Sequence, residues 1–534
     1  MEPENDSADG PVSLPLSPGL TALCGVIAVA LVFPLAWLFV EVVTVDPGRA
    51  RELTFSAGTA DVLLNSLLLM IGVTACSILL GVPLAYLTVR TDLPFRRFWS
   101  IAVALPLVVP SYVGAFAFVS AFGPQGEFRD FLAPFGVERL PEIYGLPGSV
   151  FVITLYTYPY VYLTTRAALV SFDTRLIDAA RTLNYGTWSG FRRVTLPQIR
   201  PAIAAGGLLT ALYAVSDFGT PAIMRLSVFT REIYVEYNTF GQEYAALLSI
   251  QLLVLVLAVL ALEWAIRPDQ NVRGDDADRA GSRIRLGRLR WPATLLPAGV
   301  TAMALAVPVW ILLLWLFRTD VARRPSMAFE WTQAVNSVSV AAAAAAVATL
   351  AALPVAYFAA TRDSRLGTLF ERATYVGFAV PGVVLGLALV FFGAGYVPWL
   401  YQTLPLLIFA YVVRFVPQAV GTTRTSILQV DSKLVEAGRT LGESPIGAFR
   451  RITLPHIRSG LVAGAALVFL TTMKELPVTL ILRPSGFETI VTQIWRAQAS
   501  ALYQYAAVPA LILILISGLS MVVMLAQEGE GRGL

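Results

Sequence analysis

The sequence contains very few of the residues from which metal sites and redox centres are usually built. Among its 534 residues there are two cysteines and one histidine, and only 14% of the residues are charged. Cys24 and Cys76 lie inside apolar runs, where a thiol behaves as a small hydrophobic side chain. His456 has no second histidine or cysteine with which to bind zinc or copper. We therefore expect no disulfide, no metal site and no cofactor.

Lysine is also scarce, because arginine supplies 37 of the 39 basic residues and leaves only Lys433 and Lys474. A nucleotide-binding P-loop needs the pattern GxxxxGK[ST], and neither lysine follows glycines in that spacing. No nucleophile–base pair or HExxH motif is present either, so we predict no catalytic residue and no enzyme. Residues 1–19 contain no basic residue, which argues against a cleaved signal peptide and predicts a disordered cytoplasmic tail.

Apolar residues, in contrast, are abundant. They make up 56% of the chain, and the mean hydropathy is +0.69. Runs of about 20 apolar residues, the length that crosses a bilayer, recur along the sequence. This pattern predicts an all-α transmembrane protein with twelve helices. The expected spans are 20–43, 62–89, 99–122, 148–170, 201–224, 244–266, 292–317, 333–360, 374–395, 403–429, 461–483 and 500–526.

The distribution of basic residues predicts the orientation of these spans. The loops within 90–97, 171–200, 267–290, 362–372 and 430–460 hold 23 basic residues, and the loops on the opposite side hold 11. Cytoplasmic loops carry the excess of Lys and Arg. The first set is therefore predicted to be cytoplasmic, together with both termini of the chain.

Two polar stretches reveal an internal duplication. Residues 176–203 and 434–461 are identical at thirteen of 28 positions, and upstream Asn65-Ser66 and Pro110 match Asn336-Ser337 and Pro381. Six crossings separate the copies, so the two repeats are parallel, with an expected axis along the membrane normal and a pathway between the halves. The predicted organisation is a tail over 1–19, a six-helix repeat over 20–266, a cytoplasmic linker over 267–291, a second six-helix repeat over 292–526, and a tail over 527–534.

Each polar stretch has the ends of a short helix. Asp173 and Asp431 stand where an N-cap is expected. Eleven residues later come Asn184 and Gly442, the residue types that best tolerate the left-handed conformation at a helix C-terminus. A basic helix lying at the lipid headgroups is one explanation. Two copies with matching caps, small residues and arginines favour a docking site for two copies of one partner.

Each stretch resembles the cytoplasmic EAA loop of binding-protein-dependent ABC importer permeases. The second copy, within 431–458, has the acid-Ala-Gly triplet at 436–438, a turn glycine six residues after the acid, and Ile-Thr-Leu-Pro at 452–455. The first copy, within 173–200, departs from the pattern, since Asp178 replaces Glu and Asn184 replaces Gly. The resemblance implies ATPase docking by Asp178, Ala179, Ala180, Arg181 and Asn184 in the first copy and by Glu436, Ala437, Gly438, Arg439 and Gly442 in the second.

This likeness extends over nearly the whole chain to the fused, two-half permeases of ferric-iron importers. It is carried by LPLVVPSYVGAF at 105–116, SDFGTPAI at 216–223 and KELPVTLILRPSGFETIVTQIW at 474–495. The resemblance implies a type I ABC importer permease (MetI-like) fold. It further implies two ATPase subunits, an extracytoplasmic solute-binding protein, contact with membrane lipid but not nucleic acid, and a bacterial or archaeal plasma membrane.

The cargo stays open at this point. Ferric iron is favoured, while fused thiamine permeases share the length and duplication, and phosphonate and polyamine permeases share the EAA loop. A secondary transporter would also contain repeats, but it would have no reason to duplicate an arginine-rich cytoplasmic helix. The tyrosines of LYTYPYVYL, 155–163, could offer oxygen ligands to iron, although ordinary packing explains them more simply.

Charged residues inside the fourth and fifth spans are candidates for the translocation path. Asp217 aligns with Glu475 in the fifth spans, Lys474 adjoins Glu475, and Arg414 lies in a fourth span. An ionised group in a span is costly unless it is paired or faces water. We expect the two acids to face each other near the outer mouth, either as parts of a gate held shut by a salt bridge or as cargo contacts.

Overall fold

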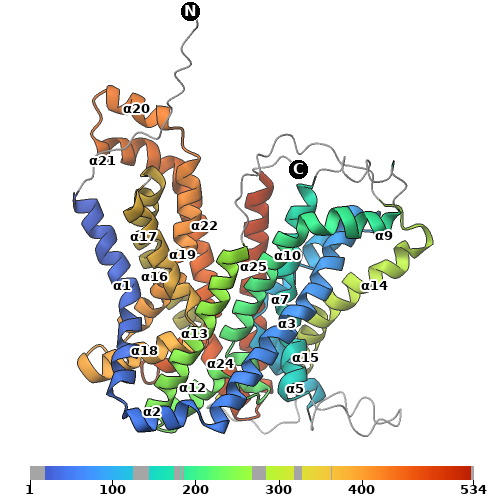
Figure 1. Ribbon diagram of the computed structural model, residues 1–534, viewed down its shortest axis with the longest axis horizontal. Helices are drawn as coiled ribbons and strands as arrows, with labels where there is room; N and C mark the ends of the chain where they lie inside the picture. Colours follow the sequence, from blue (N-terminus) through green and yellow to red (C-terminus); the bar gives the residue numbers. More distant parts are fainter. Residues whose placement is uncertain are drawn as a thin grey trace, which may run out of the picture. The chain divides into compact units, whose positions relative to one another are not determined.

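The computed structural model describes residues 18–123, 143–172, 182, 186–266, 284–317, 327–362 and 364–530. Within these ranges the chain folds into helices (Figure 1), and its single β contact is an isolated bridge between Thr91 and Ile284. The predicted all-α class is confirmed.

The described helices of the two repeats follow one another along the chain. The first repeat comprises α1 (Pro18–Thr44), α2 (Pro47–Thr54), α3 (Ala57–Arg90), α4 (Arg96–Ala102), α5 (Ser111–Phe122), α7 (Gly145–Val170), α9 (Thr187–Gly190), α10 (Leu196–Ser216), α11 (Gly219–Ile223), α12 (Phe229–Asn238) and α13 (Gln242–Ile266). The second comprises α14 (Arg290–Thr301), α15 (Val307–Phe317), α16 (Trp331–Thr361), α17 (Arg365–Ala379), α18 (Gly382–Tyr396), α19 (Leu404–Leu428), α20 (Ser432–Thr440), α21 (Pro445–Ala448), α22 (Leu454–Met473), α23 (Pro477–Leu482), α24 (Ile490–Ala499) and α25 (Gln504–Glu530).

Eight helical segments in the described part of the chain are long and apolar enough to cross a membrane, or ten if two bent pairs each count as one span. The helices α7 and α25, of 26 and 27 residues, occupy the positions of the other two expected spans. The exact count of twelve stays a prediction, since these two helices do not meet the same measure of length and hydropathy over their described residues.

The third span of each repeat, expected over 99–122 and 374–395, is bent. The chain turns by 90° before α5 and by 100° between α17 and α18. Val109 and Val380 are extended, each with ψ of 127°. Each precedes a proline, Pro110 or Pro381, and a proline disfavours helical geometry in the residue before it.

The predicted fifth spans, 201–224 and 461–483, are also misplaced. The helices begin earlier, at Leu196 and Leu454, and end at Ser216 and Met473. A break follows, and then the short helices α11 and α23. The acids at 217 and 475 consequently lie in helix breaks, where backbone N–H groups are available to them, and not inside continuous spans.

The described helices divide into two compact units. Unit 1 contains residues up to 43 together with 331–489, and unit 2 contains 44–330 together with 490–534. The first span of each repeat therefore belongs to the unit that holds the core of the other repeat.

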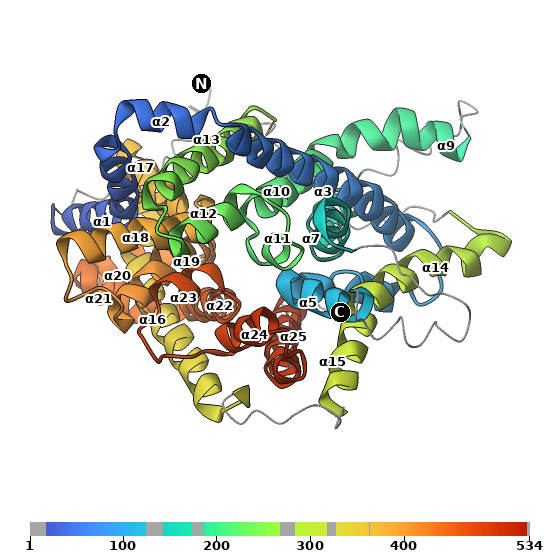
Figure 2. The same ribbon diagram turned by 90° about the horizontal axis from the view of Figure 1, so that it is seen from below.

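Each unit is centred on three packed helices, α3, α7 and α10 in unit 2 (Figure 2) and α16, α19 and α22 in unit 1. Glycines at equivalent positions allow the closest approach. A Cβ at Gly206 would lie 2.7 Å from the Cα of Val161, and a Cβ at Gly464 would lie 3.0 Å from the Cα of Ala419. Small residues at helix crossings allow such contact in membranes.

A second equivalent contact holds the loop before α12 or α24. Asn65 Nδ2 donates to the carbonyl of Ser227 at 3.0 Å, and Asn336 Nδ2 donates to the carbonyl of Glu488 at 2.9 Å. The matching asparagines found by sequence alignment thus make matching hydrogen bonds. The duplication extends from the sequence to individual side-chain contacts.

Candidate functional site

The second polar stretch forms the short capped helix that the sequence predicts. The Asp431 carboxylate accepts a hydrogen bond from the backbone N–H of Lys433 at 2.9 Å and caps α20. The helix ends before Gly442, whose φ of +92° lies in the left-handed region. Ser444 then caps α21 by accepting from the N–H of Gly447 at 3.0 Å. Both ends of the docking helix are therefore fixed by local hydrogen bonding.

Most of the predicted docking residues on α20 are accessible. Glu436, Ala437 and Arg439 are exposed, and the neighbouring Leu441 is 87% exposed. Gly438 differs, because it is buried, and a Cβ there would overlap the Cδ1 of Ile452. Its small size lets α20 lie close to its own supporting segment, so Gly438 positions the helix and does not itself face outward.

An aromatic pair anchors each polar stretch to its unit. The Phe449 ring meets Tyr357 of α16 edge to face, with centroids 5.2 Å apart, and Phe191 meets Tyr86 of α3 in the same way at 4.9 Å. Both phenylalanines begin a π-turn that leads directly into the fifth helix of the repeat. The aromatic pair therefore connects each polar stretch by packing to the helical core of its unit.

In the first copy, the predicted residues Asp178, Ala179, Ala180, Arg181 and Asn184 lie outside the described residues, as does the N-cap candidate Asp173. The following segment is described. Trp188 is 72% exposed and stacks on Phe191 with centroids 5.7 Å apart. The aligned residue of the second copy, Ile446, is equally 72% exposed. Both copies thus present a large apolar side chain just before the anchoring phenylalanine.

In the second repeat, Arg414 and Glu475 form an ion pair. The Arg414 Nε lies 3.3 Å from Glu475 Oε2, and their side chains are 15% and 8% exposed. Glu475 Oε1 also accepts the N–H of Val478 at 3.3 Å, at the start of α23. Gly382, the first residue of α18, completes the arrangement, because a Cβ there would overlap both Arg414 and Glu475. The pair therefore ties α19 to two helix breaks.

Lys474 precedes this pair at the C-terminal end of α22. Its side chain is partly exposed, and no carboxylate of the described residues lies within ion-pair distance of its ammonium. The structure therefore pairs Glu475 with Arg414 and leaves Lys474 outside the pair.

In the first repeat, Asp217 has hydroxyl partners in place of a cation. Ser111 Oγ donates to Asp217 Oδ2 at 3.0 Å, and the Tyr213 phenol donates to Ser111 Oγ at 3.1 Å. Tyr156, which aligns with Arg414, is buried and donates to the carbonyl of Ala304 at 3.2 Å. Asp217 belongs to unit 2 and Glu475 to unit 1, and the expectation that they face each other stays a prediction.

Sequence reasoning did not single out Ser111, Tyr213 or Gly382. Ser111 and Gly382 are equivalent, since each follows a matched proline, and this alignment was the available signal. Among the tyrosines of 155–163, Tyr158 and Tyr162 donate to the carbonyls of Val103 and Ser100. Ordinary packing accounts for these two.

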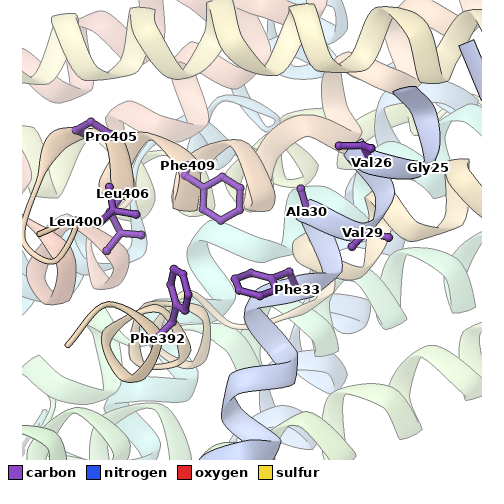
Figure 3. A pocket seen from close by; sticks show the side chains of 10 residues that line it. All are labelled: Gly25, Val26, Val29, Ala30, Phe33, Phe392, Leu400, Pro405, Leu406 and Phe409. Atoms are coloured by element: carbon purple, nitrogen blue, oxygen red, sulfur yellow. The ribbon is translucent and has the colours of Figure 1, made fainter. Parts of the chain in front are cut away.

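An apolar groove of about 690 Å³ lies in unit 1 between α1, α18 and α19 (Figure 3). Every residue that lines it is apolar, so the groove offers no group to hold a charged cargo. Its lining consists of Gly25, Val26, Val29, Ala30, Phe33, Phe392, Leu400, Pro405, Leu406 and Phe409. Nor do three His, Cys, Asp or Glu side chains meet at a metal-binding distance anywhere in the described ranges.

The family model described as binding-protein-dependent transport system inner membrane component matches residues 77–270 and again residues 352–528. The chain belongs to this family and carries its domain twice, as the duplicated helices and polar stretches indicate. Members of the family are permease subunits of multi-pass membrane transporters, so the chain is a transport subunit that works with a solute-binding protein and an ATPase.

The particular resemblance to ferric-iron permeases is also confirmed. The chain is 31% identical to the Fe(3+)-transport system permease protein FbpB 2 of Haemophilus influenzae, over 94% of this chain and 96% of the relative. It is 25% identical to the probable ABC transporter permease protein y4fN of Sinorhizobium fredii, over 82% of each chain. The sulfate transport system permease protein CysW of Escherichia coli strain K12 is 26% identical over 46% of this chain and 86% of its own length.

Proposed function

We propose that this protein is the fused permease of an ABC importer that moves ferric iron from a solute-binding protein into the cytoplasm. The observation that carries the proposal is the similarity to the Fe(3+)-transport permease, which spans both repeats without a large gap. Thiamine and other small solutes are the alternative cargoes, and sulfate and molybdenum permeases among the relatives show that the scaffold serves several substrates.

Two copies of an ATPase subunit dock on the polar stretches, one on 173–200 and one on 431–458. The exposed face of α20, with Glu436, Arg439 and Leu441, supplies charged and apolar contacts for the second copy. The Phe449–Tyr357 contact passes movement of this stretch into α16. The shared exposure of Trp188 and Ile446 supports an equivalent docking role for the first stretch.

Both termini and both docking stretches lie on the cytoplasmic side. Within unit 1, α1 begins at the end of the helix bundle that carries α20 and α21 (Figure 1). The excess of basic residues in the loops of that side supports this orientation. Cysteine substitutions at residue 8 and at Ser444, labelled from either side of sealed vesicles, test it.

Reconstitution into proteoliposomes with the cognate ATPase and solute-binding protein tests the cargo. We expect ATP-dependent uptake of radioactive iron presented as the ferric-loaded binding protein, and no uptake of thiamine. Iron uptake that is absent while another solute is imported would contradict the proposed cargo. A Glu436→Arg variant of the permease serves as the uncoupled control.

A further inference from the structure

In the first repeat, several side chains whose oxygen atoms suit a hard cation lie close together. The described residues of the second repeat contain no equivalent set. Tyr213 of α10 donates to Ser111 at the start of α5, and Ser111 donates to Asp217 in the break after α10. The ring of Tyr160, on α7, lies beside that of Tyr213 with centroids 6.2 Å apart. A carboxylate, an aliphatic hydroxyl and a phenol are thus hydrogen-bonded in series, and a second tyrosine ring lies beside that phenol.

These oxygen donors lie at the edge of the unit 2 core. Tyr160, Tyr213 and Asp217 are all partly exposed, whereas Tyr156 and Tyr158 of the same α7 are buried. Ser111 is buried and joins Tyr213 to Asp217. The side chains of Tyr160, Tyr213 and Asp217 are therefore not fully covered by the helices of unit 2.

The equivalent positions of the second repeat contain neither the serine nor the two tyrosines. Gly382 replaces Ser111, and Thr471 and Gln418 replace Tyr213 and Tyr160. Thr471 Oγ1 donates to Gln418 Oε1 at 3.1 Å. The acid at that site, Glu475, is already neutralised by Arg414. Among the described residues, only the first repeat combines an acid that has no cation partner with a phenol linked to it through a serine.

We propose that Asp217, Ser111, Tyr213 and Tyr160 form a transient coordination site for a hard trivalent cation during transport. Hard cations prefer oxygen ligands, and carboxylate and phenolate suit Fe(III) in particular. The inference rests on the proposed function, since it assigns the residues that contact its cargo.

Coordination of a phenol by Fe(III) displaces the phenolic proton, which passes to water, because ligands must lose their protons to bind a metal. No electron is transferred, and iron stays ferric. A bond between phenolate and Fe(III) gives a visible charge-transfer absorption that neither carboxylate nor hydroxyl ligands produce. This band distinguishes coordination by tyrosine from binding of iron at lipid headgroups.

The test is a titration of the purified permease in lipid nanodiscs with Fe(III) nitrilotriacetate, followed by visible absorption. We expect a band in the wild-type protein that is lost in a Tyr160→Phe/Tyr213→Phe double variant. Asp217→Asn removes the charged ligand and should weaken iron binding about tenfold, as expected for the loss of roughly 1.4 kcal/mol. The matched control is Tyr158→Phe, which removes a buried phenol of the same helix and should keep the band.

The possible results separate this site from the proposed function. Wild-type protein that imports iron but shows no band, or a band that survives in the double variant, overturns the site and leaves the function in place. Absence of ATP-driven iron uptake by the wild type overturns the function and, with it, the role of the site in transport. A monodisperse elution profile of each variant shows that loss of the band is not loss of the fold.

Discussion

The two repeats share the same helix packing but differ in the polar contacts at the break after the fifth helix. Each has a bent third span, a glycine at the crossing of its fourth and fifth helices, and an acid in the break after the fifth helix. In the first repeat Asp217 accepts from Ser111, and in the second Glu475 is paired with Arg414 over Gly382. The two repeats thus share the residues that pack their helices together, but they differ in the polar residues that contact the acid.

This difference has a physical reason. A buried carboxylate needs either a cation or hydrogen-bond donors, and both solutions satisfy that need. A serine at position 382 would place its Cβ on Arg414 and Glu475, so glycine and the ion pair occur together. Neutralising one acid and leaving the other available makes the two halves chemically unequal.

The largest effect is expected at the shared helix crossings. Gly206→Leu and Gly464→Leu would each force a whole side chain into the backbone of the neighbouring helix, an overlap that can be relieved only by separating the packed helices. Both variants should be poorly expressed in folded form, to the same degree. Fluorescence-detected size-exclusion chromatography measures the yield of folded protein. A strong defect in only one of the two variants would contradict the equivalence of the two helix crossings.

A smaller but unequal effect is expected at the two acids. Glu475→Gln leaves Arg414 without its partner, and breaking a buried ion pair costs about 3–5 kcal/mol. Asp217→Asn removes no cation partner and should cost about 1 kcal/mol, typical of one hydrogen bond. Thermal unfolding in detergent should show the larger loss for Glu475→Gln, and restoration of stability by an added Arg414→Met change would identify the uncompensated cation as the cause.

Docking is expected to be sensitive to charge and bulk on the polar stretches. Glu436→Arg or Gly442→Arg should weaken retention of the ATPase, because each adds a bulky cation to the docking face, and position 442 also requires a left-handed backbone. Asp178→Arg should act in the same direction with a smaller effect. A Glu436→Arg/Asp178→Arg protein that still captures the ATPase at the wild-type level would contradict the docking assignment.

The smallest effect is expected from the exposed apolar residues that precede the anchoring phenylalanines. Trp188→Ser and Ile446→Ser leave the unit cores intact, since both side chains are 72% exposed. We expect unchanged thermal unfolding and a modest loss of ATPase affinity in each. Equal losses would show that the two polar stretches contribute alike to ATPase binding, and unequal losses would extend the difference between the repeats to these stretches.

Much of the fold follows from the sequence, because apolar length and repeat alignment report on helices directly. The capped docking helix was also predictable, since Asp431 and Gly442 act through local hydrogen bonding and backbone conformation. The bends at Pro110 and Pro381 were missed, because apolar runs continue through them without a change in composition.

The polar contacts of Asp217 and Glu475 could be predicted only in part from the sequence. Alignment located Asp217 and Glu475, but the choice between Arg414 and Lys474 as the partner depends on helix rotation and on the space that Gly382 leaves. Ser111 is distant in sequence from Asp217, and the bend before α5 places it beside the acid. Contacts of this kind depend on tertiary packing and leave no local pattern in the sequence.

The most direct test of the account compares Asp217→Asn and Glu475→Gln in proteoliposomes with the ATPase and the binding protein. Glu475→Gln removes an ion pair that ties helix breaks together, so it should raise ATP hydrolysis in the absence of binding protein. Asp217→Asn removes the carboxylate of the proposed coordination site, so it should lower the amount of iron imported for each ATP hydrolysed. Equal changes of both quantities in the two variants, or normal uptake in the double variant, would contradict the division of roles between the repeats.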